Sequence, residues 1–532
     1  MIKYFKNFEQ TFSVNKAALI VGFFTLASRL AGLVRDRLFA SKFGAGDILD
    51  SYYAAFRVPD FVFNLLILGT LSIAFIPVFS ELLILDRQKA NRTASTILNC
   101  TLLLMCAVCF GLFIFVEPLT KALVPGFSGP KLIDTIALTR IFLLSPIIFT
   151  LSNVFTSMLN AQKKFLIVGL APVLYNIGII FGLLALYPRY GIIGLSYGVI
   201  IGALLHLGIQ IPQAIALGFR WQPILDFKDI AFKKMSRLFV PKIFGLDNSQ
   251  ISLLIGSVVG SLLASGSIAI LNLANNLQAV PLGIFALSIS VATFPALSEN
   301  FARNDNRGFL ATLSKSLAQI LFFIIPVSVS ILLLRAHIVR LVYGAGEFSW
   351  EDTILTFKTL GIFAISLFSQ SLTPLLGRAF YARRNTIIPV IINSFTMLIN
   401  GALAYFLGKA YGVVGIAAGF SIASIINVIL LFLALHNFLH KSMPKEDLHA
   451  FDLGIFSQIA KIAASSLGAG LAIYGALYAI EPFVNTRTAL GLLIQAGLAG
   501  AVGAIIYLFT ASSLHLRQAR EMLKLIKNLF EK

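Results

Sequence analysis

The chain has 532 residues, of which 58% are hydrophobic and only 12% are charged, and its mean hydropathy is +0.88. Soluble globular domains carry about 25% charged residues, so this composition excludes a soluble fold and indicates an integral membrane protein. Lysine and arginine number 42 against 23 acidic residues, which gives a net charge of +19. In a membrane protein such an excess reflects topology and anionic lipid headgroups, so we expect no nucleic-acid partner.

Long apolar runs predict the secondary structure. A helix needs roughly 20 mainly apolar residues to cross a bilayer. We therefore expect an all-α polytopic protein with about 14 transmembrane helices, and neither a β-barrel nor a cleaved signal peptide. The expected spans lie near 17–41, 61–84, 94–117, 135–160, 166–187, 192–217, 236–264, 268–297, 310–336, 353–381, 386–408, 413–437, 455–480 and 487–511.

The basic residues between these runs predict the orientation. An even number of spans places both termini on the same side of the membrane. The loops on that side hold about 25 Lys and Arg, and the loops on the opposite side hold about eight. Cytoplasmic loops carry the excess of Lys and Arg, so both termini are expected in the cytoplasm.

The sequence also repeats itself weakly. Segment 71–81 (LSIAFIPVFSE) resembles 289–299 (ISVATFPALSE) at an offset of 218 (289 − 71), and two later matches have offsets of 217 and 221: Pro172 and Asn176 with Pro389 and Asn393, and Tyr190-Gly191 with Tyr411-Gly412. A repeat of six spans keeps its orientation, which predicts two pseudo-symmetric six-helix lobes related by an axis along the membrane normal. The expected parts are a lobe at 1–217, a cytoplasmic linker at 218–242, a lobe at 243–437, two further spans within 438–513, and a basic amphipathic tail at 514–532.

The first span carries charges that do not belong in lipid. Arg29, Arg35 and Asp36 lie within an apolar run, and an ionisable group at the bilayer centre costs several kcal/mol. Asp36 follows Arg29 by seven residues and should share its helix face, whereas Arg35 points elsewhere. This helix is predicted to line a hydrated cationic cavity. The alternative is that Arg35 and Asp36 simply neutralise one another.

Further cations are expected at this cavity. Arg57 precedes Asp60 at the start of the second span, and Arg140 and Lys358 stand at the offset of the repeat (358 − 140 = 218), which places them at equivalent positions of its two copies. The same offset sets Arg29 against Asp247, and we hypothesise an ion pair between them across the lobe interface. The alternative for Arg57 is a structural role, and Arg140 and Lys358 could instead lie near a membrane face.

These cations suggest the ligand. Arginine binds phosphate oxygens with two parallel hydrogen bonds, so the cavity suits an amphiphile with an anionic head and a lipid tail. The sequence contains neither a P-loop nor the motif HExxH, and it has no acidic cluster for a metal. We expect a transporter and not an enzyme, without a cofactor, driven by a coupling ion or the membrane potential.

The first two spans resemble the MurJ (MviN) lipid II flippases of the multidrug/oligosaccharidyl-lipid/polysaccharide (MOP) exporter superfamily. The matching residues are Ser28-Arg29, Gly32, Arg35-Asp36, Phe43-Gly44-Ala45-Gly46, Asp50, Ala54-Ala55-Phe56 and Pro59, with weaker support from Pro77, Leu159-Asn160-Ala161, Ala171-Pro172-Val173 and Ala379-Phe380-Tyr381. The resemblance implies 14 spans and export of the undecaprenyl-pyrophosphate-linked peptidoglycan precursor. It also implies that Arg29, Arg35 and Asp36 line the pyrophosphate site, and that Asp50 matches a family acid.

Two positions depart from the family pattern. The resemblance implies an arginine in span 2, where this chain has none around Phe63. It also implies an arginine in span 8, where this chain has Asn276. Either Arg57, Arg140 and Lys358 compensate or the substrate differs.

Two other functions therefore stay open. One is a MOP-type exporter of another lipid-linked oligosaccharide. The other is a membrane-embedded glycan polymerase, which would use the acids of the outer loop at 337–352. We expect a lipid-linked glycan and membrane lipids as partners, a monomeric chain, and association with cell-wall synthesis proteins.

Overall fold

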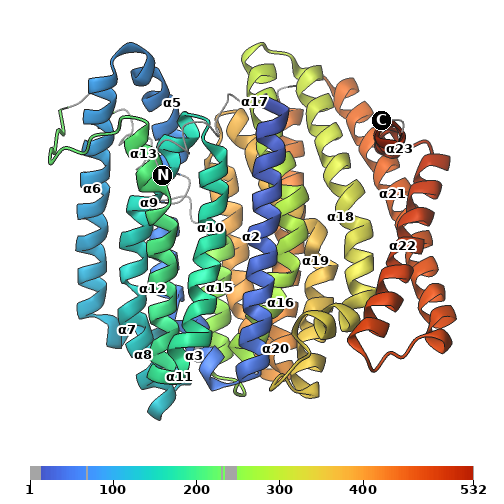
Figure 1. Cartoon of the computed structure of the whole chain (residues 1–532). Coiled ribbons are helices and arrows are strands. Elements are labelled where there is room, and N and C mark those ends of the chain that lie inside the picture. The colour runs from blue at the N-terminus through green and yellow to red at the C-terminus, as the bar shows by residue number, and fades with distance from the viewer. Residues whose placement is uncertain (1–13, 68–69, 229–231, 234–247, 442, 531–532) are drawn as a thin grey trace. The chain divides into compact units, whose positions relative to one another are not determined.

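The chain folds into helices throughout the part that the structure describes. The computed structural model describes residues 14–67, 70–228, 232–233, 248–441 and 443–530, and these contain no strand, which confirms the all-α prediction (Figure 1). The chain divides into two compact units, Met1–Ala269 and Ile270–Lys532.

The first unit contains long helices interrupted by short breaks. Its helices are α2 (Val14–Phe43), α3 (Asp47–Ala55), α4 (Arg57–Leu66), α5 (Thr70–Leu85), α6 (Arg87–Ile114), α7 (Val116–Leu123), α8 (Gly129–Phe142), α9 (Leu144–Ala161), α10 (Phe165–Phe181), the π-helix η1 (Gly182–Leu186), α11 (Tyr187–Tyr190), α12 (Ile192–Gly208), α13 (Gln210–Ala216) and α15 (Asn248–Ser261). The predicted second span is thus divided between α4 and α5. The predicted seventh span contains α15, which packs on α4 and α7 and so belongs to this compact unit.

The second unit is built from longer helices. They are α16 (Ser267–Pro281), which begins in the first unit, η2 (Leu282–Leu287), α17 (Ser288–Ala302), α18 (Asn306–Tyr343), α19 (Trp350–Ala382), α20 (Ile387–His440), α21 (Lys445–Ile480), the 3-10 helix η3 (Glu481–Phe483), α22 (Ala489–Ser513) and α23 (Arg517–Phe530). Apolar side chains of α17, α18, α19, α20 and α21 form its main core. In Figure 1, α21 and α22 form the orange-to-red pair of helices that is followed by α23.

Ten helical segments among the described residues are long and apolar enough to cross a membrane. One of them, α20, has 54 residues and is broken at Gly412, where φ is 63° and ψ is −146°. A helix of that length would measure about 80 Å, more than twice the hydrocarbon thickness, so the break divides it into two membrane-crossing segments. The chain is therefore a multi-pass membrane protein, while the number fourteen stays a prediction.

The backbone carries the repeat that the sequence predicts. Gly191 has φ 58° and ψ −144°, nearly the values of Gly412, and the offset between the two is 221 (412 − 191). Lys163 and Arg384 stand at the same offset (384 − 163 = 221), and both adopt the left-handed conformation, with φ of 59° and 60°. A left-handed non-glycine residue is uncommon, so the same turn at the same spacing is strong evidence for duplication.

The start of the predicted linker packs on α6. Asn99 donates hydrogen bonds to the carbonyls of Gln222 and Ile224, each at 2.9 Å, and accepts one from Trp221 Nε1 at 2.9 Å. Arg92 pairs with Asp226 at 3.1 Å. The first part of the linker is thus tied to the first unit.

Glycines bring α10 and η1 against α12. A Cβ atom on Gly178 would lie 2.3 Å from Gly202 Cα, and one on Gly198 would lie 2.5 Å from Gly182 Cα. Each helical segment therefore presents glycines four residues apart, the small-xxx-small pattern by which membrane helices approach closely. Close backbone packing replaces the hydrophobic driving force that apolar burial supplies in water.

We expect Gly198→Ala to destabilise the first unit by about 1–3 kcal/mol, because the new methyl group meets backbone atoms that cannot move aside. The matched control is Gly208→Ala in the same helix, where a Cβ has no atom within 4 Å. Alanine is favoured over glycine in a helix by roughly 0.5–1 kcal/mol, so this control should be neutral or stabilising. Thermal unfolding of the purified variants in detergent measures the difference, and equal midpoints would show that the two segments are not held by this contact.

Candidate functional site

The first charged cluster is centred on Arg35 of α2. Its Nε and one terminal nitrogen donate to Asp36 Oδ1 at 2.9 and 2.7 Å, and the other terminal nitrogen donates to Asn176 Oδ1 of α10 at 3.0 Å. Asn176 is oriented by a hydrogen bond from its Nδ2 to the carbonyl of Pro172 at 3.0 Å. The guanidinium is therefore fixed by three hydrogen bonds, while 23% of the Arg35 side chain is still exposed.

The first span contains an ion pair. Asp36 is 3% exposed and pairs with Arg35. Arg29 is exposed on the same helix. Asp247, the hypothesised partner of Arg29 at the lobe interface, lies outside the described residues.

A second cluster is centred on Arg57, the first residue of α4. Arg57 is 8% exposed, and its Nε donates to Ser257 Oγ of α15 at 2.9 Å. Ser257 is itself held by a bond to the carbonyl of Leu253 at 3.0 Å. Asp60, three residues further along α4, attracts Arg57 electrostatically but is exposed. A neutral hydroxyl on another helix thus helps to orient the buried cation.

Tyr53 connects the two clusters electrostatically. This buried side chain interacts with Asp36 and Arg35 of the first cluster and with Arg57 of the second. Within the described part of the chain, its hydroxyl has no hydrogen-bond partner. A phenol here can donate to an anion that both arginines attract. The sequence signal was a tyrosine four residues before Arg57 in an apolar run, and it was missed.

Asp50 does not join these residues. It is 1% exposed and accepts hydrogen bonds from Lys131 Nζ at 2.8 Å, from the Gly266 N–H at 2.8 Å and from the Ala269 N–H at 2.9 Å. Its carboxylate therefore caps the start of α16. Neighbouring Asp47 shares Lys131 at 2.6 Å, and hydrogen bonds from Lys131 and Ser265 lower the pKa of this carboxyl.

Arg140 and Lys358 are both exposed, on α8 and α19. Ser128 and Ser349 stand at the N-cap positions of α8 and α19 at an offset of 221 (349 − 128), and the side chain of Ser349 accepts a capping hydrogen bond. With that offset Arg140 corresponds to Gly361, three residues past Lys358. The match of Arg140 with Lys358 used the offset of 218 between segments 71–81 and 289–299.

An arginine lies beside Gly361, the position that corresponds to Arg140 at the offset of 221. A Cβ on Gly361 would lie 2.9 Å from Cδ of Arg335 in α18. Arg140 itself interacts electrostatically with Glu117.

Comparison with known proteins matches most of the chain to one family. The family model described as lipid II flippase MurJ matches residues 39–494. The chain belongs to the MurJ family. It is 30% identical over 512 residues to a probable lipid II flippase MurJ from Buchnera aphidicola subsp. Acyrthosiphon pisum, covering 94% of this chain and 98% of that protein. A probable MurJ from Vibrio cholerae is also 30% identical, over 438 residues that cover 79% of this chain and 82% of its own length.

A solved structure of MurJ, in an inward closed conformation, matches with a TM-score of 0.75 and 28% identity, covering 95% of this chain and all of that one. An inward-facing MATE family transporter of the MOP superfamily matches with a TM-score of 0.63 at 15% identity, covering 78% of this chain and 96% of its own. The second match shows a shared fold.

The two positions that depart from the MurJ pattern are occupied by other interactions. Phe63 packs its ring 5.7 Å from that of Phe149, within the apolar core of the first unit. Asn276 is half-buried on α16, next to a chain of amides in which Gln278 donates to Asn275 at 3.0 Å and accepts from Gln370 at 3.0 Å. Apolar packing and neutral amides thus occupy the surroundings where the resemblance implied arginines.

The acids considered for a polymerase lie at the start of α19. Ser349 and Asp352 form a reciprocal capping box with two hydrogen bonds of 3.0 Å. Glu347 and Glu351 are exposed. Asp352 therefore stabilises a helix end. MurJ is a flippase family and not a family of catalysts, which agrees with the expected transporter.

Proposed function

We propose that this chain moves lipid II, the undecaprenyl-pyrophosphate-linked peptidoglycan precursor, from the inner to the outer leaflet of the bacterial inner membrane. Membership of the MurJ family supports this substrate. The observation that carries the proposal is the cluster of Arg35, Tyr53 and Arg57, in which the buried phenol interacts electrostatically with both arginines and Arg35 pairs with the buried carboxylate of Asp36. Such a cluster suits a pyrophosphate, which is anionic and accepts several hydrogen bonds.

The two arginines would bind the pyrophosphate in different ways. Asp36 and Asn176 hold Arg35 in one orientation, so little entropy is lost when an oxygen binds it. Ser257 orients Arg57 through a neutral hydroxyl, and an incoming phosphate would bring this guanidinium a charged acceptor. Tyr53 would donate its hydroxyl proton to the same group. The pyrophosphate would lose its hydration when it binds in the apolar interior, so each charge-assisted hydrogen bond would contribute more than it does in water.

Export would follow alternating access of the cluster to the two leaflets. The membrane potential or an exchanged ion is expected to drive the cycle. The chain is expected to act as a monomer with both termini in the cytoplasm.

The test is complementation of a bacterium depleted of its own MurJ, with outer-leaflet lipid II labelled directly. The wild-type chain should restore growth and labelling. Arg29→Ala should fail, because it removes a cation that the resemblance assigns to the pyrophosphate site. The variant should still be present at the normal level, because Arg29 is exposed. Arg189→Ala, which changes an exposed arginine of α11, is the matched control and should rescue.

The opposite outcomes are informative. Rescue by Arg29→Ala would remove this residue from the substrate site. Failure of a correctly inserted wild-type chain would reject lipid II and favour another lipid-linked oligosaccharide, with Phe63 and Asn276 as the first positions to restore to arginine.

A further inference from the structure

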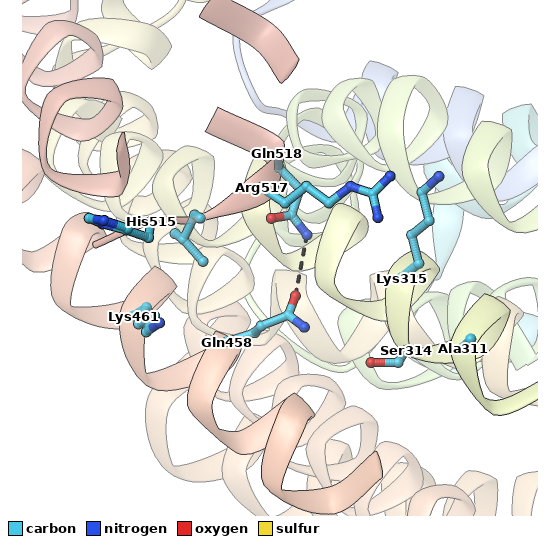
Figure 2. A pocket seen from close by; sticks show the side chains of 9 residues that line it. Ala311, Ser314, Lys315, Gln458, Lys461, His515, Arg517 and Gln518 are labelled. Carbon is cyan, nitrogen blue, oxygen red and sulfur yellow. Dashed lines mark hydrogen bonds between the residues drawn. The ribbon is translucent and has the colours of Figure 1, made fainter. Parts of the chain in front are cut away.

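A cationic pocket lies in the second unit, away from the arginine cluster. Its volume is about 320 Å³, and its side chains, most of them labelled in Figure 2, come from α18, from α21, from the connection between α22 and α23 and from the start of α23. The lining residues are Ala311, Ser314, Lys315, Gln458, Lys461, His515, Leu516, Arg517 and Gln518.

The lining attracts anions. Lys315, Lys461 and Arg517 supply three positive charges, and no acid is among the lining residues. In Figure 2 the guanidinium of Arg517 and the ammonium of Lys315 extend toward one another. Gln518 donates to Gln458 at 3.3 Å, while Gln518 Oε1 is buried and has no hydrogen-bond partner in the described part of the chain. The pocket thus offers cations together with an unused acceptor for a hydroxyl or ammonium group.

One acid lies beside the pocket. Glu521 accepts a hydrogen bond from Arg517 at 2.7 Å, and this bond lowers the pKa of the Glu521 carboxyl. Both side chains are more than half exposed, so the pair is easily exchanged for a better anion. Glu521 also attracts Lys315 electrostatically. An anion in the pocket would therefore compete with Glu521 for Arg517.

The pocket is held in place by the first turn of α23. Leu516 and Ala519 are buried in an apolar cluster with Ile462 of α21 and Tyr507 of α22. The Tyr507 hydroxyl in turn donates to the carbonyl of Phe322 in α18 at 2.6 Å. The three elements that supply the cations are therefore packed on one another, and the pocket does not depend on a flexible tail.

Lys315 lies near the depth of lipid headgroups if α18 is centred in the membrane. With 38 residues, α18 is about 57 Å long, whereas the hydrocarbon layer is about 30 Å thick. A centred helix would leave the hydrocarbon about 13 Å from either end, and Lys315 lies nine residues, about 14 Å, from the first residue. Lys461 lies eight residues into the candidate span that begins at Leu453.

We propose that this pocket binds the phosphate of an anionic phospholipid headgroup such as phosphatidylglycerol. The cations neutralise the phosphodiester, and Gln518 Oε1 accepts a hydrogen bond from a headgroup hydroxyl. Free phosphate shares the anionic chemistry, but it lacks the acyl chains that the surrounding apolar helices contact at this depth. The site is independent of the transported substrate.

The full-length chain, purified in detergent, is mixed with phosphatidylglycerol, with phosphatidylcholine or with inorganic phosphate, and bound ligand is counted by native mass spectrometry. One phosphatidylglycerol should be retained in preference to phosphatidylcholine. Lys315→Gln and Arg517→Gln should each weaken its binding about fivefold, the contribution of one basic residue near a charged lipid surface. Glu521→Gln should strengthen binding, because it releases Arg517.

Arg520→Gln is the matched control, since Arg520 is an exposed arginine of the same helix outside the lining. Thermal midpoints without lipid show whether each variant is folded. Phosphatidylglycerol retention by Lys315→Gln and Arg517→Gln equal to that of Arg520→Gln would overturn the site. Binding of inorganic phosphate that displaces phosphatidylglycerol would overturn the lipid as its occupant.

Discussion

Replacing Arg57 by alanine is expected to reduce lipid II export at least about 100-fold, because two charge-assisted hydrogen bonds of about 1.5–3 kcal/mol each would be lost. The fold should persist. Asp60, the acid that attracts Arg57, is exposed, so water can solvate its carboxylate when the arginine is removed. The Ser257 hydroxyl keeps its bond to Leu253. Outer-leaflet lipid II labelling in MurJ-depleted cells measures the loss, and thermal unfolding of the purified variant checks the fold.

Two companion variants separate binding from structure. Arg57→Lys keeps the charge without the two-pronged geometry, so it should restore part of the export. Tyr53→Phe removes only a hydroxyl that has no protein partner among the described residues, so it should reduce export about tenfold without lowering stability. Wild-type export by Arg57→Ala would mean that this arginine only ties α4 to α15.

The fold was largely predictable because apolar runs and loop charge are local properties. The repeat was predictable from short matching segments, among them Gly191 and Gly412, whose conformation other residues rarely adopt. The charges of the first span were also readable, because Arg35 and Asp36 are neighbours and a buried acid needs a partner. Each of these signals lies within one helix or at one turn.

The contacts of the candidate site depend on which helices pack together, and the sequence does not show this. Nothing in the sequence near Asn176 or Ser257 indicates that these residues would orient Arg35 and Arg57, since they follow by 141 and 200 residues. The match of Arg140 with Lys358 stays a prediction, because matched positions of the repeat differ in offset, from 217 to 221.

Asp50 was predicted at the substrate cavity, and its contacts lead to a different expectation. Asp50→Ala should destabilise the first unit by about 3 kcal/mol, because it removes a buried charge partner and a helix cap at once. Lys131 would keep Asp47, but the Gly266 and Ala269 N–H groups would lose their acceptor. The midpoint of thermal unfolding in detergent should fall by several degrees, and export should fall only as far as the folded fraction does.

Asp47→Ala is the matched control for Asp50→Ala. Both acids contact Lys131, but the Asp47 side chain is 62% exposed whereas that of Asp50 is 1% exposed. An exposed ion pair contributes about 0–1 kcal/mol, so Asp47→Ala should unfold close to the wild-type temperature. If the Asp50→Ala protein is stable but has lost export, Asp50 acts in the substrate cavity. A large loss of stability in Asp50→Ala alone would assign it to the junction between α3, α8 and the start of α16.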